Sequence, residues 1–195
     1  RFVKQARRGK SIRHYHEPGH LHEFTFSCYR LLPLLTNDDW RRKLSRYIDA
    51  ANECCRWQLV AFVFMPEHVH LLTDPLDDEP DIGAYLQVVK EPFSKAIHKG
   101  LVERQSNLLK KLVIRDRPGR ECFRFWQEGA GYDRNLWTKQ AIRSSIDYIH
   151  QNPVRRGLCL KATEWKWSSA RWYCNEPPRQ QDPDLPHIHG LRSEL

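Results

Sequence analysis

The sequence predicts an α+β protein built on an antiparallel sheet, with helices packed on that sheet. Strand-like and helix-like segments follow one another in the order strand, helix, strand, strand, helix, strand. The chain has 195 residues, of which 40% are hydrophobic. This size and composition allow one domain with a core plus appendages, and they exclude a disordered chain. The order of the segments is that of a ferredoxin-like or RRM-like sheet.

Hydrophobic patterning defines the first half of the chain. Phe24 and Phe26 alternate with polar residues, as in a strand with one buried face. Asn37 or Asp38 can cap a helix whose apolar residues recur on one face. The predicted segments are a strand over 22–29, a helix from Asn37 or Asp38 to about residue 55, and strands over 57–65 and 68–73, separated by Pro66.

The second half contains two further helices and one further strand. Asp81 starts a helix to about Lys99, and Pro92 is expected to kink or interrupt it because proline has no N–H. A basic connector, 104–120, contains the turn signal Pro118-Gly119. The remaining predicted segments are a strand at Phe123–Trp126, a helix capped by Thr138, and an irregular Pro/Asp-rich tail from Asn175 onward.

The charge balance favours a polyanionic partner. The chain has 32 Lys and Arg against 24 Asp and Glu, which gives a net charge of +8 and a pI near 9.3. Basic charge by itself reports only nonspecific attraction. We expect a basic N-terminal arm over 1–20, one domain over 21–174 and the irregular tail over 175–195. The cations of the arm are Arg1, Lys4, Arg7, Arg8, Lys10 and Arg13.

The cysteines and the hydropathy pattern bear on localisation. Six cysteines are scattered without a Cys-x-x-Cys pair, so a structural zinc site has little support and reduced thiols are expected. The sequence shows neither a signal peptide nor an apolar stretch long enough to span a bilayer. We therefore expect a cytoplasmic protein with no membrane partner.

One histidine pair stands between two strongly apolar runs. His68 and His70 flank Val69, so in a strand both histidines face one side and Val69 faces the other. Their Cβ atoms would lie about 7 Å apart, and neutral imidazoles at that spacing can converge on a divalent metal ion. Spacing alone is weak evidence, since most such pairs are surface or core histidines. The other His-x-His pairs of this chain are His14/His16, His20/His22 and His187/His189.

A second constellation lies within residues 141–158. Tyr148 and Asn152 are four residues apart, so they share a helix face if the helix continues that far. Pro153 disfavours helical geometry at Asn152, which predicts a kink or an end there, and Gly157 suits a C-terminal cap or turn. Alternatively, Tyr148 is an amphipathic residue with its ring buried and its hydroxyl in water. The apolar residues at helical spacing are Ile142, Ile146 and Ile149.

Together these motifs resemble a known family. The segment MPEHVHLL, followed by IDYIHQNPVRRGL and WKWSSARWY, is similar to the single-tyrosine HUH transposases, and most closely to the REP-associated tyrosine transposases related to the IS200/IS605 enzymes. The segments EPGHLHEFTFSCYRLLPLL and FRFWQEGAGYDRNLW fit as well, so the resemblance spans about residues 8–175. It implies the HUH nuclease fold, with a tyrosine helix across the histidine face. One departure is Glu67, where Asn is expected; we expect its side chain to point away from that face.

The resemblance implies a metal-dependent reaction on DNA. Tyr148 would attack a phosphodiester, forming a 5′-phosphotyrosine bond and releasing a 3′-hydroxyl, and the same site could rejoin strands. A tyrosine hydroxyl has a pKa of about 10 and needs activation, which Mg²⁺ or Mn²⁺ on His68 and His70 would supply. The resemblance makes the amide oxygen of Asn152 a third ligand. Nearby alternatives as ligand or proton shuttle are His150 and Gln151.

The expected substrate is single-stranded DNA beside a repeat hairpin, and a monomer is favoured over a homodimer. The aromatic cluster Trp165, Trp167, Trp172 and Tyr173 could stack on bases, although such clusters are more often core. Arg155 and Arg156 follow the tyrosine helix, and the other interpretation of this pair is a solvated helix end. The candidate phosphate contacts are Arg7, Arg8, Lys10, Arg13, Arg155 and Arg156.

Two other functions remain compatible with the residues. One is a catalytically inactive module that binds single-stranded nucleic acid. The other is a phosphodiesterase that uses histidine-bound metal without a covalent tyrosine. A trapped protein–DNA adduct distinguishes the transposase-like enzyme from both.

Overall fold

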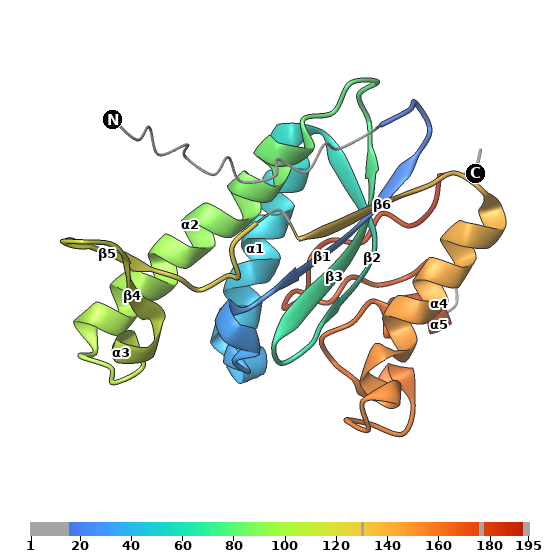
Figure 1. Ribbon diagram of the computed structural model, residues 1–195. Coiled ribbons are helices and arrows are strands. Elements are labelled where there is room, and N and C mark those ends of the chain that lie inside the picture. The colour runs from blue at the N-terminus through green and yellow to red at the C-terminus, as the bar shows by residue number, and fades with distance from the viewer. Residues whose placement is uncertain (1–15, 130, 176–177, 193–195) are drawn as a thin grey trace.

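The computed structural model describes residues 16–129, 131–175 and 178–192. Its centre is a four-stranded antiparallel sheet with strand order β2-β3-β1-β6 (Figure 1). Two helices cover one face of the sheet, and a third covers the other. This arrangement confirms the predicted α+β class and its antiparallel sheet. The elements are β1 (Leu21–Ser27), α1 (Asp38–Cys55), β2 (Trp57–Phe64), β3 (His68–Pro75), α2 (Ile82–Glu103), β6 (Tyr132–Leu136) and α4 (Lys139–Arg155).

Helices α1 and α2 begin at the predicted positions. The side chain of Asn37 accepts a hydrogen bond from the Trp40 N–H, and that of Asp81 accepts one from Ala84. Helix α2 runs unbroken from Ile82 to Glu103, so the expected interruption at Pro92 is wrong. A proline inside a helix costs about 3 kcal/mol. Burial of large apolar residues, at about 1.5–3 kcal/mol each, offsets that cost: Val89, Phe93 and Ile97.

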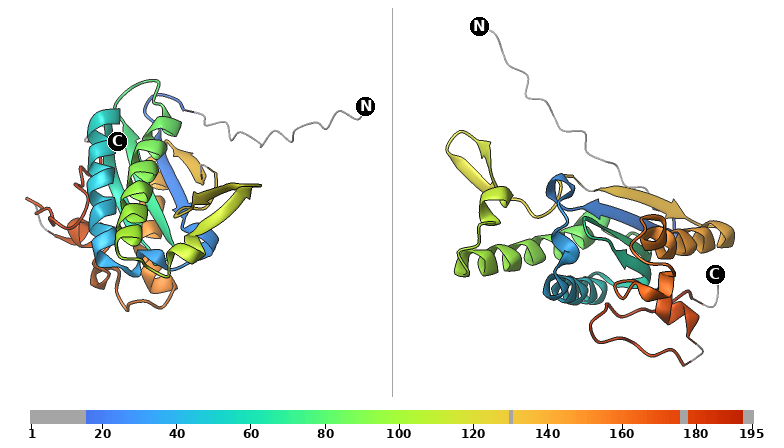
Figure 2. Two further views of the ribbon diagram at one scale, coloured as in Figure 1. Left: turned by 90° about the vertical axis from the view of Figure 1, so that its left-hand side faces the viewer. Right: turned by 90° about the horizontal axis from the view of Figure 1, so that it is seen from below.

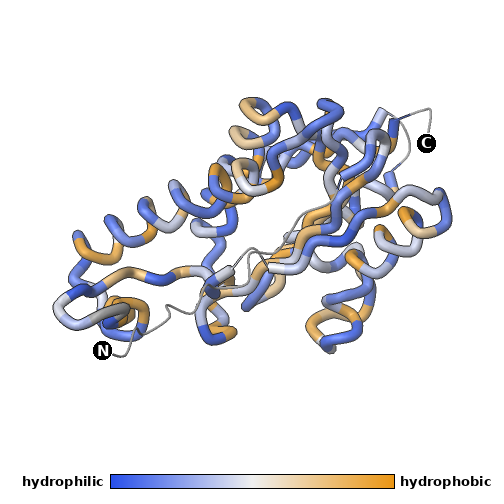
Figure 3. The backbone as a smooth tube through the Cα atoms, turned by 45° about the horizontal axis from the view of Figure 1, so that its top comes forward, coloured by the Kyte–Doolittle hydropathy of each residue, from blue (hydrophilic) through white to orange (hydrophobic). Residues whose placement is uncertain are grey.

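Helix α4 packs on the opposite face of the sheet through the predicted isoleucines. Ile142, Ile146 and Ile149 join a buried cluster with Val63 and Leu72. This second cluster is separate from the larger core beneath α1 and α2. Hydrophobic residues accordingly gather along the central strands, and hydrophobic and hydrophilic residues alternate along the helices (Figure 3). The sheet is therefore buried on both faces.

The ends of α4 decide where Asn152 lies. The Thr138 side chain caps the first turn by accepting from the Ala141 N–H, as predicted. The helix then continues through Pro153 to Arg155, so an end at Asn152 is wrong. Gly157 has a φ of +67° and the Leu158 N–H bonds the Pro153 carbonyl at 2.9 Å, which closes the helix with a glycine in the left-handed region.

The fourth strand of the sheet differs from the prediction. Phe123–Trp126 alternates like a strand, but only a single bridge, between Trp126 and Cys28, continues past Phe123. Phe125 and Trp126 instead fill the core under α2. The sheet edge is β6, whose polar sequence gives little strand signal. Gly131, at φ +83°, permits this pairing, since a Cβ there would lie 2.2 Å from the Thr25 carbonyl oxygen.

The predicted basic connector contains regular structure. It forms a short helix, α3 (Leu109–Leu112), and a hairpin of β4 (Val113–Arg117) and β5 (Arg120–Phe123). Gly119 occupies the turn with a φ of +77°. Figure 2 shows this hairpin projecting from the body of the domain. The connector therefore forms a projecting arm that consists of α3, β4 and β5.

The C-terminal segment packs back onto the domain. Two short 3-10 helices, η1 (Tyr29–Leu31) and η2 (Leu34–Thr36), lie before α1. After α4 come a third 3-10 helix, η3 (Ala162–Glu164), and the short helix α5 (Ala170–Cys174). Beyond these, Ile188 is buried and the His189 N–H bonds the Leu59 carbonyl at 2.9 Å. In the part of the chain that the structure describes, no helix is long and apolar enough to cross a membrane.

Candidate active site

The histidine pair lies on the sheet face that α4 covers. Val69 packs in the core beneath α1 and α2, so His68 and His70 face the other side, as the strand alternation predicted. The His68 Nε2 and His70 Nε2 atoms are 3.1 Å apart, and the two rings are nearly perpendicular, at 81°. Both imidazoles therefore point their Nε2 atoms at one place.

Each imidazole is held from behind through its Nδ1 atom. The His68 Nδ1 lies 3.0 Å from Glu67 Oε1, and the His70 Nδ1 lies 2.8 Å from Thr25 Oγ1. Since a carboxylate only accepts, His68 carries its proton on Nδ1 and presents a lone pair at Nε2. With the His68 Nε2 as an acceptor, the His70 Nε2 donates to it in this structure, and the Thr25 hydroxyl donates to the His70 Nδ1. Because the Thr25 hydroxyl can also accept, it is compatible with the other tautomer, in which the His70 Nε2 presents a lone pair to a metal ion.

Burial keeps both imidazoles neutral. It lowers the pKa of His70 to about 3, with His68 as a smaller contribution. Burial also lowers the pKa of His68, although the Glu67 carboxylate opposes that shift. Neutral imidazoles are the form that binds metal ions. The pair is thus ready to act as ligands at neutral pH.

Tyr148 faces the histidine pair from α4. Its ring stands perpendicular to that of His70, with 5.7 Å between the ring centroids, and its side chain is 41% exposed. The Arg155 guanidinium lies over the Tyr148 ring at 5.0 Å. A cavity of about 570 Å³ opens beside these residues; its lining also includes Glu23, Thr25, Tyr132, Arg134 and Ser144. Helix α4 therefore crosses the histidine face as expected, and Tyr148 is the residue that contacts His70.

Asn152 lies one turn further along α4 and is nearly buried. Its Nδ2 donates to the Tyr148 carbonyl at 2.9 Å, which leaves the Oδ1 lone pairs available. In the described part of the chain, no hydrogen bond joins Asn152 to either histidine. The same ranges contain no cluster of three or more His, Cys, Asp or Glu placed to hold a metal ion. Among the described residues, the amide oxygen of Asn152 is therefore a candidate third ligand, as are groups from solvent or substrate.

The accessory candidates are placed differently from Tyr148. The His150 ring is buried, its Nε2 lies 2.8 Å from Ser169 Oγ, and burial lowers its pKa to about 4. Its ring also packs against Tyr173, so it belongs to the contact between α4 and α5. Gln151 is exposed. Among the clustered aromatics, Trp167 is buried and the Tyr173 hydroxyl donates to the Val60 carbonyl, which favours a core role for both.

Arg156 connects the tyrosine helix to the histidine pair. Its Nη1 lies 2.7 Å from Glu67 Oε1, the same oxygen that bonds the His68 ring. The expectation that Glu67 points away from the histidine face is therefore wrong, because its side chain folds back between an imidazole and a guanidinium. Arg156 is consequently paired, whereas no ion pair of the described residues includes Arg155.

Glu23 is a site residue that the sequence did not single out. Its buried carboxylate accepts from Arg134 at 2.6 Å and from the Ser145 hydroxyl at 2.8 Å, and lies 3.9 Å from the His70 Nδ1. Glu23 and Thr25 share the polar face of β1, opposite Phe24. That alternation was visible in the sequence, but the pairing of β1 with β3 was needed to place this face beside His70.

The other predicted residues do not join this site. Arg7, Arg8, Lys10 and Arg13 lie outside the described residues. The buried His22 bonds Asp133 and His16, at 2.9 Å each. His187 and His189 contact each other in the C-terminal segment. The six cysteines are free thiols, in agreement with the sequence.

Comparison with known proteins identifies relatives of this chain. No family model matches. A curated Haemophilus influenzae protein named "Putative REP-associated tyrosine transposase" is 23% identical over 154 residues, which cover 75% of this chain and 82% of that protein. The chain is similar to the REP-associated tyrosine transposases. This finding confirms the resemblance seen in the motifs, and tyrosine transposases are enzymes.

A solved structure supports the same relationship at the level of the fold. It is described as a REP-associated tyrosine transposase bound to a REP hairpin. It superposes with a TM-score of 0.64 at 19% identity, over 94% of this chain and 98% of the other. At that identity the superposition shows that the fold is shared.

Proposed function

We propose that this chain is a divalent-metal-dependent endonuclease and strand transferase for single-stranded DNA, in which Tyr148 forms a 5′-phosphotyrosine bond. The observation that carries this proposal is the position of Tyr148 against His70, in an open cavity next to two converging imidazoles. Tyr148 is 41% exposed and its ring faces His70, which supports a role beyond packing.

The residues of the pair fit a divalent ion. Two ligands at right angles, each about 2.1 Å from an ion, are separated by about 3.0 Å, close to the 3.1 Å between the Nε2 atoms. The carboxylate behind His68 fixes the required tautomer, as outer partners of metal-binding histidines commonly do. His68, His70 and the amide oxygen of Asn152 would hold Mg²⁺ or Mn²⁺. When bound, such an ion polarises a phosphate and neutralises charge that develops on it.

The residues of the chain perform the rest of the reaction. The Tyr148 hydroxyl gives its proton to solvent as its oxygen bonds to phosphorus. The bond from phosphorus to the 3′ oxygen breaks, and the 3′ oxygen takes one proton from solvent and leaves as a hydroxyl. Arg155 lies over the Tyr148 ring, and its guanidinium would bind the phosphate that Tyr148 attacks. Attack by a 3′-hydroxyl on the phosphotyrosine reverses these bond changes and rejoins a strand. No external energy source is needed, because one ester replaces another.

The expected partner is single-stranded DNA beside a hairpin. The relative solved with a REP hairpin, the net charge of +8 and the cations at the cavity support this proposal. Tyr148 and His70 meet within one chain, which favours a monomer acting on its own bound strand.

The first test compares single-stranded and duplex DNA. We expect cleavage of a labelled single strand carrying a hairpin, and at least about tenfold slower cleavage of the same sequence when fully paired, because duplex DNA must first be unpaired. Both rates are measured at one salt concentration with Mg²⁺ or Mn²⁺, since binding depends on salt. Equal rates on the two substrates would contradict the proposed specificity.

A second prediction concerns the link between Glu67 and Arg156. Replacement of Arg156 by Ala frees the Glu67 carboxylate and loosens α4 from His68, so we expect cleavage to slow by about 10- to 100-fold. Glu67→Gln should slow cleavage by a similar factor. The double variant should be only slightly slower than either single variant, because both changes break the same hydrogen-bond network. Rates under single-turnover conditions measure these effects.

Arg143→Ala is the matched control for this network. Arg143 is exposed on the same helix, and no ion pair of the described residues includes it. Its loss should leave the cleavage rate within about twofold of the unmodified protein. Independent, multiplicative losses from Glu67→Gln and Arg156→Ala would show that the two residues do not act together.

A further inference from the structure

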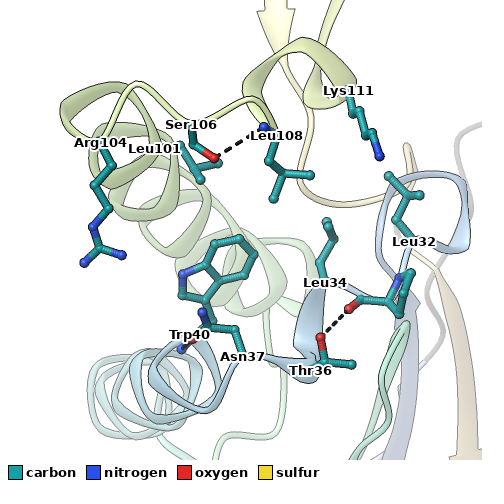
Figure 4. A pocket seen from close by; sticks show the side chains of 11 residues that line it. Leu32, Leu34, Thr36, Asn37, Trp40, Leu101, Arg104, Ser106, Leu108 and Lys111 are labelled. Carbon is teal, nitrogen blue, oxygen red and sulfur yellow. Dashed lines mark hydrogen bonds between the residues drawn. The ribbon is translucent and has the colours of Figure 1, made fainter.

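A second cavity lies at the end of the domain away from α4. It has a volume of about 560 Å³ and opens where the segment before α1, the start of α1, the C-terminal end of α2 and the short helix α3 meet (Figure 4). Figure 1 shows α3 and this hairpin on the opposite side of the molecule from the tyrosine helix. The cavity is thus separate from the candidate active site.

The walls of this cavity are apolar and include an aromatic ring. Trp40 lines it together with leucines that converge from three segments (Figure 4): Leu34, Leu101 and Leu108. The Asn37 side chain fixes the Trp40 backbone, and the indole packs edge-on with Phe125 at 5.6 Å. The indole is only half-buried, so part of it remains open to the cavity.

Two hydroxyl groups of the cavity lining are hydrogen-bonded within the chain. The Thr36 hydroxyl donates to the Pro33 carbonyl at 2.9 Å, and the Ser106 hydroxyl accepts from the Leu108 N–H at 3.3 Å. The aromatic surface and the charged residues are the other groups of the lining that can recognise a ligand. A ligand for this cavity needs an apolar or aromatic body.

Two cations stand on opposite sides of the opening. Arg104 comes from the end of α2 and Lys111 from α3 (Figure 4). Neither takes part in an ion pair among the described residues, and both are exposed. Further exposed cations that lack an ion pair within the described ranges continue along the projecting arm: Lys110, Arg115 and Arg120. The opening is therefore positive, and positive charge extends away from it.

We propose that this cavity is a second DNA site that binds one unpaired nucleotide. Its base stacks on Trp40 against the leucines, and the flanking phosphates bind Arg104 and Lys111. An aromatic face beside a positive groove is the arrangement that binds unpaired bases, and the volume lies within the range of about 300–1,000 Å³ of ligand pockets. An apolar peptide would match the walls but leave both cations without a partner.

This proposal rests on the proposed function, because it takes DNA as the substrate. Tyr148 lies on the sheet face opposite α1 and α2, so the nucleotide in this cavity is not the one that is cleaved. The cavity holds an unpaired base elsewhere on the same DNA, and the arm follows the adjoining phosphates. The site would thus determine the specificity of the protein among hairpin-bearing strands.

Photochemical cross-linking tests the position of the base. The probe is a hairpin oligodeoxynucleotide with single-stranded flanks, in which 5-iodouracil replaces one unpaired base at a time. We expect one substituted position to cross-link to the tryptic peptide 31–41, whose only aromatic residue is Trp40. Trp40→Phe should retain binding because it retains a stacking surface, and Trp40→Leu should weaken binding about tenfold.

Charge variants test the phosphate contacts without altering the apolar walls. The double variant Arg104→Ala/Lys111→Ala should bind the hairpin about tenfold more weakly and reduce the slope of log affinity against log salt by about 1.4. The matched control is Lys95→Ala/Lys99→Ala, which also removes two cations. Both are in α2, where Lys95 pairs with Glu91 and Lys99 pairs with Glu103. It should change binding by less than about twofold.

Two results would overturn the proposal. One is cross-linking confined to other peptides at every substituted position, and the other is equal loss of affinity in the test and control double variants. Formation of the Tyr148 adduct by unmodified protein is followed in the same samples. A normal adduct together with either result would remove the second site and leave the proposed function intact.

Discussion

Tyr148→Phe should eliminate the covalent protein–DNA adduct. Phenylalanine has no oxygen to attack phosphorus, so the loss of adduct should be complete within detection. The ring still packs beside His70 and under Arg155, and the side chain is 41% exposed, so stability should change by less than about 0.5 kcal/mol. DNA affinity should stay within about twofold, because no charge is removed. The assay is a denaturing gel with a 3′-labelled single-stranded hairpin, which keeps the label on the phosphotyrosine side.

Tyr132→Phe is the matched control, because Tyr132 lines the same cavity and is 58% exposed. It should form the adduct at an undiminished rate. A labelled adduct of normal yield from Tyr148→Phe would assign the nucleophile to another residue. Metal-dependent cleavage without any adduct from the unmodified protein would instead favour the phosphodiesterase, and binding without cleavage would favour the inactive module.

Replacement of either histidine of the pair should abolish both metal binding and cleavage. His70→Ala removes one of two converging Nε2 atoms, and His68→Ala removes the other. Loss of one ligand from an open site with so few protein ligands should weaken Mn²⁺ binding by at least about 100-fold. Calorimetry or the electron paramagnetic resonance of Mn²⁺ measures this affinity directly. Cleavage at saturating DNA provides the second measurement.

The pKa values of the pair set the expected pH dependence. Protons compete with the metal for Nε2, so affinity falls only as the pH approaches the pKa of each imidazole. Because burial lowers the pKa of both rings, to about 3 for His70, affinity should be nearly constant as the pH falls from about 8 to about 6. The exposed His187 belongs to another His-x-His pair, and His187→Ala should bind Mn²⁺ like the unmodified protein. Mn²⁺ binding retained by His70→Ala would rule out the pair as ligands.

Local patterning was sufficient for the elements that carry the candidate site. Period-two alternation placed His68 and His70 on one face and Val69 on the other, and Thr138 caps the start of α4 as predicted. The patterning was insufficient where tertiary packing decided the conformation. Phe125 and Trp126 alternate like strand residues but fill the core, while the polar segment Tyr132–Leu136 forms the sheet edge.

The sequence by itself determined the order of the elements from β1 to α2, the shared face of the histidine pair and the helix that carries Tyr148. These properties follow from side-chain periods of 2 and 3.6 residues, which act over a few neighbours. Only the tertiary structure brought Thr25 to His70 across 45 positions and Arg156 to Glu67 across 89. Such contacts depend on strand register and on where α4 crosses the sheet, and packing over the whole domain determines both.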